Sequence, residues 1–400
     1  MKNVLFAWRN LILVVFLAAP TFVSAAEFQV SDSCKISLLT CSPGNELYSC
    51  FGHSGIRVND PLERVDIVFN YGTFDFERPG FYVNFCRGIL IYSLGVDQYF
   101  DFENQYIYEQ RGLSEQILNL TTEEKQAIVE FLLTNAQREN RDYRYDFLLD
   151  NCATRIRDVF EKHLGRKLAF HTEKWDTTKT FRYLIDEYSW FKRWESFGMN
   201  LLIGLPVDKP TTPRQQMFLP NYLRDGFTTA TVNGNEPFVT ATREILPAPN
   251  FDKSANWTSP EWLFAIILGL LMLLTFAEIR FNFHVKVVDF ILLFTTGLLG
   301  LLFLTLWLFT QHWTTAWNLN LLWALPTHLL LAFAILFNGL YPKLKQIIFI
   351  ALILEIAFLT LHFVLPQPFQ IGMILINAML VTRLFRLYWK AKSLEQKIIQ

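Results

Sequence analysis

The chain has 400 residues, of which 52% are apolar and only 18% are charged. Soluble domains carry about 25% charged residues, so this composition argues against a single soluble domain and excludes a disordered chain. Residues 27–261 hold 33 acidic and 25 basic residues, a net charge of −8, whereas the residues from Trp262 onward hold four and nine, a net charge of +5. The first part is acidic, and the second is apolar with its basic residues near the ends of apolar stretches. This distribution of charge argues against nucleic acid as a partner.

The amino terminus has the pattern of a secretory signal. Lys2 and Arg9 precede an apolar run at 11–19, and small residues at 23–26 provide a cleavage site. An uncleaved anchor helix is the alternative, although the apolar run is short for a membrane span. In both cases the residues that follow face an extracytoplasmic space. We therefore expect a signal peptide at 1–26 and an exported catalytic domain at 27–250.

The carboxy-terminal part is predicted to be a bundle of about five transmembrane helices. Five apolar stretches approach the ~20 residues that are needed to cross a bilayer. They are Trp262–Ala277, Val287–Phe309, Leu319–Phe337, Ile347–Leu365 and Phe369–Leu387. Lysine and arginine occur in the first and third connections and after the last stretch, but not in the second and fourth connections. We therefore expect a tether at 251–261, transmembrane helices at 262–387 and a tail at 388–400. Because basic residues are enriched in cytoplasmic loops, the tether is expected outside the cell membrane and the tail in the cytoplasm.

The exported domain begins with strands and continues with helices. Strand patterns occur at Lys35–Thr40, Gly55–Val58, Val65–Tyr71 and the aromatic segment Phe81–Phe85. A capping signal at Thr121 predicts a helix through Asn135, and apolar residues at helical spacing predict a second helix that starts at Cys152. This order indicates an α+β domain, followed by the all-α membrane part.

Five cysteines lie in the exported domain, at positions 34, 41, 50, 86 and 152. Disulfides are the default expectation in an oxidising compartment, but five is an odd number, so at least one thiol is left over. Cys152 is the best candidate for a nucleophile, because a thiolate in the first turn of a helix faces unpaired backbone N–H groups and the positive end of the dipole. Arg155 and Arg157 are expected to strengthen this field.

A thiol nucleophile needs an imidazole to take its proton and a polar group to hold the ring. His53, in the motif Gly-His-Ser-Gly, is the only histidine in the stranded half of the domain. His163 and His171 follow the cysteine in charged segments, and we expect them to be exposed. For the group that orients His53, Asn70 at the end of a strand is preferred. Asp66, which shares its face, is the reserve choice.

Four segments carry a resemblance to a known family. They are SLLTCSPGNELYSCFGHSG at 37–55, VFNYG at 68–72, YRYDFLLDNCATRIRD at 143–158 and MFLPNY at 217–222. Together they resemble the exported domain of membrane-anchored lipoprotein N-acyltransferases of the Lnb type. The resemblance implies a permuted papain-like fold, as in the NlpC and lecithin–retinol acyltransferase superfamily, with His53 and Cys152 in the matching catalytic positions. It also implies acyl transfer through a thioester.

On this resemblance the acyl donor is a membrane phospholipid and the acceptor is the N-terminal amine of a diacylated lipoprotein. The protein then lies in a bacterial inner membrane with its catalytic domain in the periplasm. Several membrane helices favour lipid substrates, because an enzyme that acts on soluble peptides needs at most one anchor. Substrate-binding candidates at the outer face are His312, Asn318 and Asn320. A cysteine peptidase or amidase acting on cell-wall peptides and a non-enzymatic membrane scaffold are the alternatives.

Two further polar residues, Glu355 and Asn377, fall near the middle of the fourth and fifth apolar stretches. Polar groups at this depth usually face the bundle interior. These two residues therefore either contact lipid or pair helices, or the boundaries of the spans are misplaced. The sequence leaves these alternatives open. The cysteines near His53 match no zinc spacing, and the sequence contains no phosphate loop or dinucleotide fingerprint. We expect neither a metal nor a cofactor.

Overall fold

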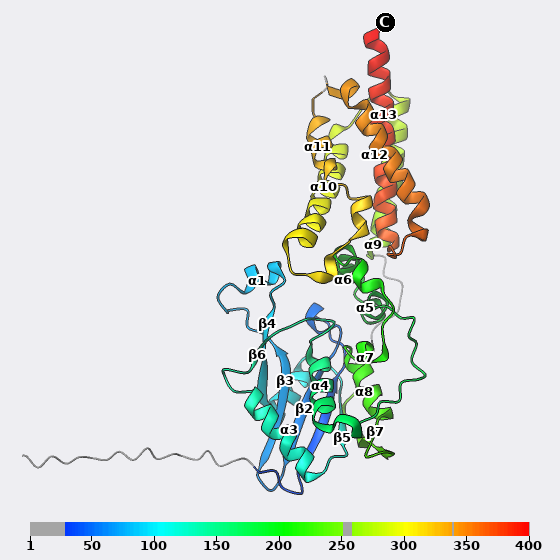
Figure 1. The fold of residues 1–400 in the computed structure, drawn as a ribbon. Coiled ribbons are helices and arrows are strands. Elements are labelled where there is room, and N and C mark those ends of the chain that lie inside the picture. Colours follow the sequence, from blue (N-terminus) through cyan, green and yellow to red (C-terminus); the bar gives the residue numbers. More distant parts are fainter. Residues whose placement is uncertain (1–28, 251–257, 338–339, 400) are drawn as a thin grey trace, which may run out of the picture.

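The computed structural model describes residues 29–250, 258–337 and 340–399. The predicted signal and most of the predicted tether lie outside these residues. A sheet-containing domain is followed by a bundle of long helices (Figure 1). We call residues 29–250 the sheet domain and residues 258–399 the helical bundle.

An antiparallel sheet forms the centre of the sheet domain. Its strands are β1 (Lys35–Cys41), β2 (His53–Asp60), β3 (Val65–Thr73), β4 (Ile91–Gln98), β5 (Leu113–Leu118), β6 (Asp142–Arg144) and β9 (Val239–Leu246). Their order across the sheet is β6-β4-β3-β2-β1-β5-β9, and a separate ribbon pairs β7 (Thr231–Val232) with β8 (Glu236–Pro237). The three strands predicted within 35–71 are confirmed as β1, β2 and β3. The β2 and β3 strands pair directly, which brings residues near 53 and 70 to one end of the sheet.

Helices cover both faces of this sheet. On one face α4 (Cys152–Leu164) packs on β2 and β3, and α3 (Thr122–Asn135) packs on α4. On the other face lies α2 (Tyr99–Tyr108). Successive strand residues point to opposite faces, and accordingly Leu38 belongs to the core under α4 whereas Leu39 packs with the side chains of α2. The predicted helices at Thr121 and Cys152 are both confirmed, and with them the α+β class.

The chain between this sheet and the bundle forms short helices. They are α5 (Phe181–Ser189), α6 (Arg193–Leu202), α7 (Pro213–Gln216) and α8 (Pro220–Thr229). Figure 1 shows α5 and α6 between the sheet and the lower end of the bundle. The α7 and α8 helices flank α4 instead. The sheet domain therefore meets the bundle through helices and loops rather than through strands.

The aromatic segment predicted as a fourth strand is instead a helix, α1 (Phe81–Arg87), so that prediction was wrong. Aromatic residues favour strands, but Gly80 and Gly88 bound the segment with φ of 77° and 76°, in the left-handed region that glycine adopts readily. The N–H of Gly88 donates to the carbonyls of Asn84 and Phe85 and closes the helix. These flanking glycines outweigh the preference of the aromatic side chains.

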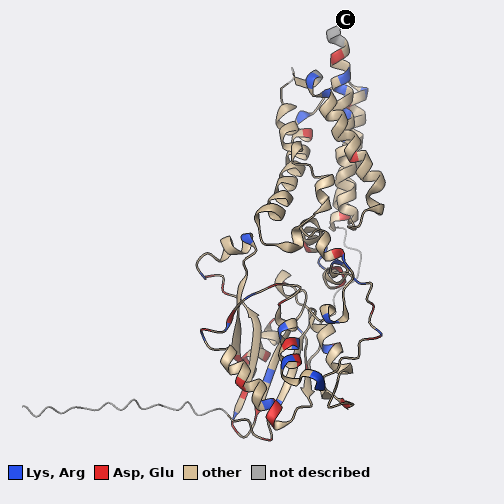
Figure 2. Ribbon diagram, in the orientation of Figure 1, with Lys and Arg blue, Asp and Glu red and all other residues tan. Residues whose placement is uncertain are grey.

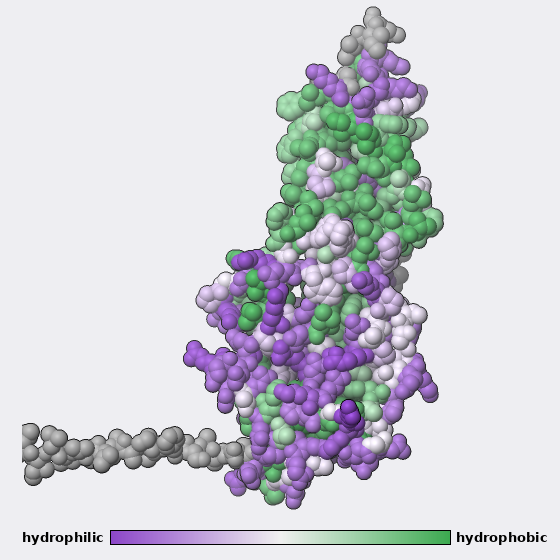
Figure 3. Space-filling view, viewed as in Figure 1, coloured by the Kyte–Doolittle hydropathy of each residue, from purple (hydrophilic) through white to green (hydrophobic). Residues whose placement is uncertain are grey.

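The bundle contains four helices that are long and apolar enough to cross a membrane among the described residues. They are α9 (Pro260–Arg280), α10 (Lys286–Phe309), most of α12 (Tyr341–Leu361, with the span reaching Val364) and most of α13 (Ile371–Ile399, with the span ending at Gln396). Figure 2 shows lysine and arginine gathered at the end of the bundle farthest from the sheet, and Figure 3 shows an apolar surface below them.

The third predicted span, 319–337, is not one continuous helix, which corrects the prediction. It forms a 3-10 turn at Leu319–Leu322 and then the short helix α11 (Thr327–Ala334). Pro326 cannot donate a backbone hydrogen bond and interrupts the segment. The segment still runs the length of the bundle, because Leu319 N donates to Gln367 at 2.9 Å at one end and Lys286 Nζ donates to the Leu336 carbonyl at 3.0 Å at the other.

Two glycines of α10 let the interrupted segment pack closely. A Cβ on Gly300 would lie 2.0 Å from the Ala324 carbonyl oxygen, and one on Gly297 would lie 2.4 Å from Leu329 N. Irregular backbone at membrane depth is tolerated where protein surrounds it. The close approach of α10 provides that shelter.

The buried polar residues of the bundle pair its helices. Glu355 is fully buried within α12, accepts a hydrogen bond from Asn377 on α13, and lies 3.3 Å from His328 Nε2 on α11. The span boundary is therefore not misplaced. A buried polar group joins three segments of the bundle, and this is the helix-pairing arrangement rather than contact with lipid.

Candidate active site

Local hydrogen bonds hold Cys152 in the first turn of α4. The side chain of Asn151 accepts from the Thr154 N–H at 2.9 Å, and the Thr154 hydroxyl accepts from the Asn151 N–H at 2.8 Å. The Asn151 amide also donates to the carbonyls of Phe147 and Phe218, each at 2.8 Å. This reciprocal cap satisfies backbone N–H groups at the N-terminal end of the helix. It leaves Cys152, which is 8% exposed, at the positive end of the helix dipole.

The sheet supplies the histidine and its orienting group. His53 begins β2, and its Nε2 lies 2.5 Å from Oδ1 of Asn70 on β3. The Asn70 amide donates in turn to Asp97 on β4 at 3.2 Å. The second ring nitrogen of His53 is thereby left for the thiol, and the side chains of His53 and Cys152 are hydrogen-bonded. The structure brings Cys152, His53 and Asn70 together, although the first two lie 99 positions apart in the chain.

The electrostatics of this group favour a thiolate beside an imidazolium. Burial acts to raise the pKa of Cys152, but the charge of His53, its hydrogen bond, and the backbone N–H groups of Ser54 and Ala153 together lower it. Burial acts to lower the pKa of His53, but the charge of Cys152 and the hydrogen bonds to Cys152 and Asn70 raise it. The two shifts act in the same direction, since a lower pKa of the thiol and a higher pKa of the imidazole both favour transfer of the proton from the sulfur to the ring.

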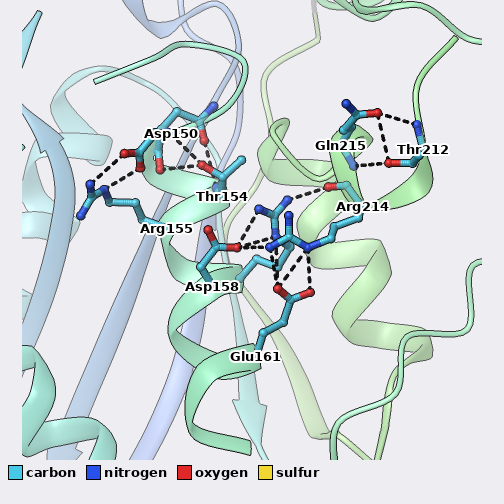
Figure 4. Close-up of polar contacts among 10 residues, drawn as sticks. Asp150, Thr154, Arg155, Asp158, Glu161, Thr212, Arg214 and Gln215 are labelled. Carbon is cyan, nitrogen blue, oxygen red and sulfur yellow. Dashed lines mark hydrogen bonds and ion pairs between the residues drawn. The ribbon is translucent and has the colours of Figure 1, made fainter. Parts of the chain in front are cut away.

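The two arginines expected to strengthen the field at Cys152 are paired with other groups, and Figure 4 shows the pair of Arg155 with Asp150. Arg155 makes a bidentate pair with Asp150 at 2.7 and 2.8 Å. Arg157 donates to Asp158 at 2.7 Å and to the Arg214 carbonyl at 2.6 Å. Their charges are thus neutralised by carboxylates. Neither arginine is among the groups that lower the pKa of Cys152, and the bond from Arg157 to Arg214 instead joins α4 to α7.

A cavity of about 660 Å³ opens over the three residues. Ligand sites typically occupy roughly 300–1,000 Å³. Most of its lining is apolar, and aromatic residues from the chain between β3 and β4 form one wall. A second cavity of about 490 Å³ shares Tyr145 and Phe147 with it and reaches His312 and Trp313 at the edge of the bundle. Together they make an apolar space that extends from Cys152 toward the bundle.

Arg111 is a cavity residue that the sequence patterns did not single out. Its side chain is 5% exposed, Nε donates to the Ser42 carbonyl at 2.9 Å and Nη1 to Glu109 at 2.8 Å. Nη2 is buried and has no hydrogen-bond partner among the described residues. A buried, unpaired guanidinium nitrogen is costly. Because Arg111 lines the cavity, a turn of its side chain would offer this nitrogen to an anionic oxygen there.

The other predicted residues lie away from Cys152. Asp66 forms an ion pair with Arg57 at 2.7 Å and is not near His53. His171 is exposed, as expected, whereas His163 is partly buried against Phe131. Neither histidine lines the cavity of Cys152.

The substrate-binding role expected of Asn318 and Asn320 does not fit the geometry. Both are buried, and their amides donate to the carbonyl of Leu201 at 2.7 and 3.1 Å. Their side-chain oxygens accept from other groups of the protein. His312 lines the second cavity and hydrogen-bonds to the Phe85 carbonyl at 2.9 Å through its Nε2. These residues join the bundle to the sheet domain.

All five cysteines are unpaired thiols, so the default expectation of disulfides is not met. Burial raises the pKa of Cys34 to about 11 and those of Cys41 and Cys50 to about 12. These three are therefore protonated and unreactive at neutral pH. Cys86 is exposed on α1. Cys152 is distinguished from the buried thiols by its histidine.

Comparisons with known proteins identify the family. A model of the Lnb N-terminal periplasmic domain matches residues 25–187, and a model of the Lnb transmembrane domain matches residues 252–394. No curated protein and no solved structure matches the chain. The two matches place an exported α+β domain before a membrane part, in the order that the structure has. The chain thus belongs to the Lnb family, which indicates an enzyme of lipoprotein maturation.

Proposed function

We propose that the protein moves a fatty acyl chain from a membrane phospholipid to the N-terminal amine of a diacylated lipoprotein, through a thioester on Cys152. The observation that carries this proposal is the Cys152–His53–Asn70 group in an apolar cavity beside the helical bundle. The sheet domain would lie in the periplasm and the carboxy terminus in the cytoplasm. The basic far end of the bundle supports that orientation.

The first half-reaction forms the thioester. The Cys152 thiolate attacks the ester carbonyl carbon of the donor, and backbone N–H groups at the start of α4 are placed to stabilise the oxyanion. The carbon–oxygen bond then breaks, and the imidazolium of His53 gives its proton to the leaving glycerol oxygen. A lysophospholipid departs, and the acyl chain remains on the sulfur. The unpaired Nη2 of Arg111 supports a donor that carries a phosphate.

The second half-reaction uses the neutral histidine. The lipoprotein amine attacks the thioester carbonyl, and His53 accepts a proton from the nitrogen as the amide bond forms. The carbon–sulfur bond breaks, and the thiolate–imidazolium pair is restored. The second cavity, which adjoins the first at Tyr145 and Phe147, offers space for the acceptor.

Membranes that contain the full chain test this proposal. We expect mass spectrometry of a lipoprotein's N-terminal peptide to show a third acyl chain, with one lysophospholipid produced for each chain gained. Cys152→Ala should abolish both products, and Cys86→Ser, which removes an exposed cysteine outside the catalytic group, should keep both. N-acylation by Cys152→Ala would overturn the proposal. Cleavage of cell-wall peptides without lysophospholipid would point to a cysteine peptidase instead.

A further inference from the structure

The connection between β3 and β4 exposes a cluster of large apolar side chains. The exposed fractions are 54% for Phe76, 68% for Tyr82, 63% for Val83 and 47% for Phe85. The ring of Phe81 lies 5.2 Å from that of Phe76, so the segment forms one aromatic group. We call residues 74–87 the α1 lip. A grouped apolar surface of this kind marks an interaction site rather than ordinary solvent-exposed protein.

Contacts to the bundle hold the α1 lip at the end of a membrane-spanning helix. Gln311 N donates to the Arg87 carbonyl at 2.8 Å, and His312 Nε2 contacts the Phe85 carbonyl at 2.9 Å. Both partners follow directly after α10, which ends at Phe309. A Cβ on Gly88 would lie 2.6 Å from His312 N, so the backbones meet without space for a side chain. The lip is therefore fixed where α10 leaves the membrane.

The figures agree with this placement. In Figure 1, α1 lies beside the lower end of the bundle, away from the far end of the sheet. In Figure 3, apolar residues occur on this projection, next to the apolar surface of the bundle. Trp317, in the same loop after α10, is 61% exposed. Aromatic side chains are enriched where a protein meets the headgroup region of a bilayer.

The α1 lip also forms one wall of the cavity of Cys152. Phe76, Phe81, Tyr82 and Phe85 all line that cavity. Strand order places the lip, which connects β3 to β4, on one side of β2 and His53. Arg111, which precedes β5, is on the other side of the same strand. An acyl chain that crosses the lip would thus reach Cys152 from the side of the cavity that the aromatic residues line. The phosphate of the same phospholipid would then lie on the opposite side, toward Arg111.

We propose that the α1 lip enters the outer leaflet of the membrane and carries an acyl chain of a bilayer lipid from the leaflet into the cavity of Cys152. The occupant of the exposed aromatic surface is the lipid bilayer itself. Insertion of the lip depends only on the geometry above, whereas the passage of a substrate chain rests on the proposed function. The two can therefore be tested separately.

Lipid contact can be measured at a natural cysteine. Cys86 is exposed on α1, and the other four cysteines are buried. The full chain with Cys152→Ser is labelled with a fluorophore on Cys86 and placed in phosphatidylcholine nanodiscs. Lipids that carry a spin label in the upper part of the acyl chain should quench this fluorophore several-fold. The matched control carries Leu62→Cys with Cys86→Ser. Leu62 is 71% exposed in the β2–β3 turn, at the strand ends opposite His53. Equal quenching at both positions would overturn the proposal.

Passage of the substrate chain is tested with Val83→Asp. Val83 is exposed on the lip but does not line the cavity, so a carboxylate there opposes insertion without altering the site. We expect acyl transfer from vesicle phospholipids to fall about tenfold or more, while thioester formation from a short-chain, water-soluble ester stays unchanged. Leu62→Asp should affect neither. An unchanged rate with vesicles, or an equal loss with both donors, would contradict the role of the lip.

The two proposals fail in different ways. If the unaltered protein forms no thioester from either donor, the proposed acyl transfer is wrong, yet quenching at Cys86 still decides whether the lip contacts lipid. Quenching by a lipoprotein that carries the spin label, without quenching by labelled lipid, would assign the aromatic surface to a protein partner and overturn the lipid proposal.

Discussion

At the scale of single residues, the state of Cys152 depends on one neighbour. A thiol with only 8% exposure would ordinarily be protonated, as the other buried cysteines are. The pKa of Cys152 is lowered despite its burial because His53 carries a charge and a hydrogen bond to it. The pKa of His53 is raised by the same contact. Lower pH therefore protonates the thiolate, and higher pH removes the proton of the imidazolium.

The first prediction concerns the alkylation of Cys152. Alkylation requires the thiolate, so its rate should rise with pH through a midpoint below the ~8.5 of an ordinary cysteine. In His53→Ala burial acts without the opposing charge, and we expect the midpoint to move above that value. Peptide-resolved mass spectrometry after iodoacetamide treatment measures this, with the exposed Cys86 as an internal control. An identical profile in both proteins would exclude the thiolate–imidazolium pair.

A second prediction at this scale concerns Arg111. If its unpaired Nη2 binds the donor phosphate, Arg111→Gln should raise KM for phospholipid about tenfold or more, since a hydrogen bond to a charged group contributes about 1.5–3 kcal/mol. Arg111→Lys should keep part of this binding. Kinetics with diacylglycerol, which lacks the phosphate, provide the control. A similar loss with both lipids would show that Arg111 only supports the fold.

At the scale of secondary-structure elements, the interrupted segment after α10 is the main departure from the prediction. Hydropathy alone suggests a span at 319–337, because the apolar run is long enough. The break comes from Pro326 and from the packing of Gly297 and Gly300 against the broken backbone. The buried pair of Glu355 and Asn377 then ties α12 to α13 beside it. His328 on α11 lies 3.3 Å from Glu355 and so joins the segment to this pair without a continuous helix.

The third prediction tests this packing through Gly300→Ala. The new Cβ would lie 2.0 Å from the Ala324 carbonyl, and overpacking of this kind typically costs about 1–3 kcal/mol. We expect a lower melting temperature in detergent. Gly269→Ala on α9 is the matched control, because its Cβ would meet nothing within 4 Å and alanine favours a helix. Equal stability of the two variants would mean that α10 and the segment do not approach as described.

At the scale of the whole molecule, the sheet domain is fixed on the bundle. Asn318 donates to the Leu201 carbonyl at 2.7 Å, and Gly204 N donates to the Thr314 carbonyl at 2.8 Å. Trp313 Nε1 donates to Asp146 at 2.5 Å beside the second cavity. Since these bonds join the two parts at the edge of the membrane helices, the cavity of Cys152 keeps one height and one direction relative to the bilayer.

The fourth prediction follows from this attachment. In Asn318→Ala the Leu202 carbonyl loses its donor and the Leu201 carbonyl keeps only the bond from Asn320, at a cost of about 0.5–1.5 kcal/mol for each hydrogen bond lost. We expect hydrogen exchange of the Gly204 amide to accelerate about 10- to 100-fold, with the sheet amides unchanged. Asn140→Ala, which removes an exposed amide near β6, is the control. Uniform acceleration would indicate global unfolding and contradict a local junction.

Much of the fold was predictable because its signals are local. The capping residues at Thr121 and Asn151 adjoin the helices that they start, and the alternation in β1–β3 is read within each strand. The α1 helix was not predictable from its aromatic composition, since its two flanking glycines decide the conformation. The candidate site was predictable where a residue type was scarce, as with His53, or where a polar residue ended a strand, as with Asn70.

The sequence alone determined the two-part organisation, the membrane segments apart from one interruption, and the choice of Cys152, His53 and Asn70. Each of these follows from the length of an apolar run, a capping pattern or the order of residue types along the chain. Only the tertiary structure decided that Arg111 lies at the cavity, that Asn318 and Asn320 join the two parts, and that the α1 lip lies against the loop after α10. Those features depend on contacts between residues far apart in the chain, which no local pattern records.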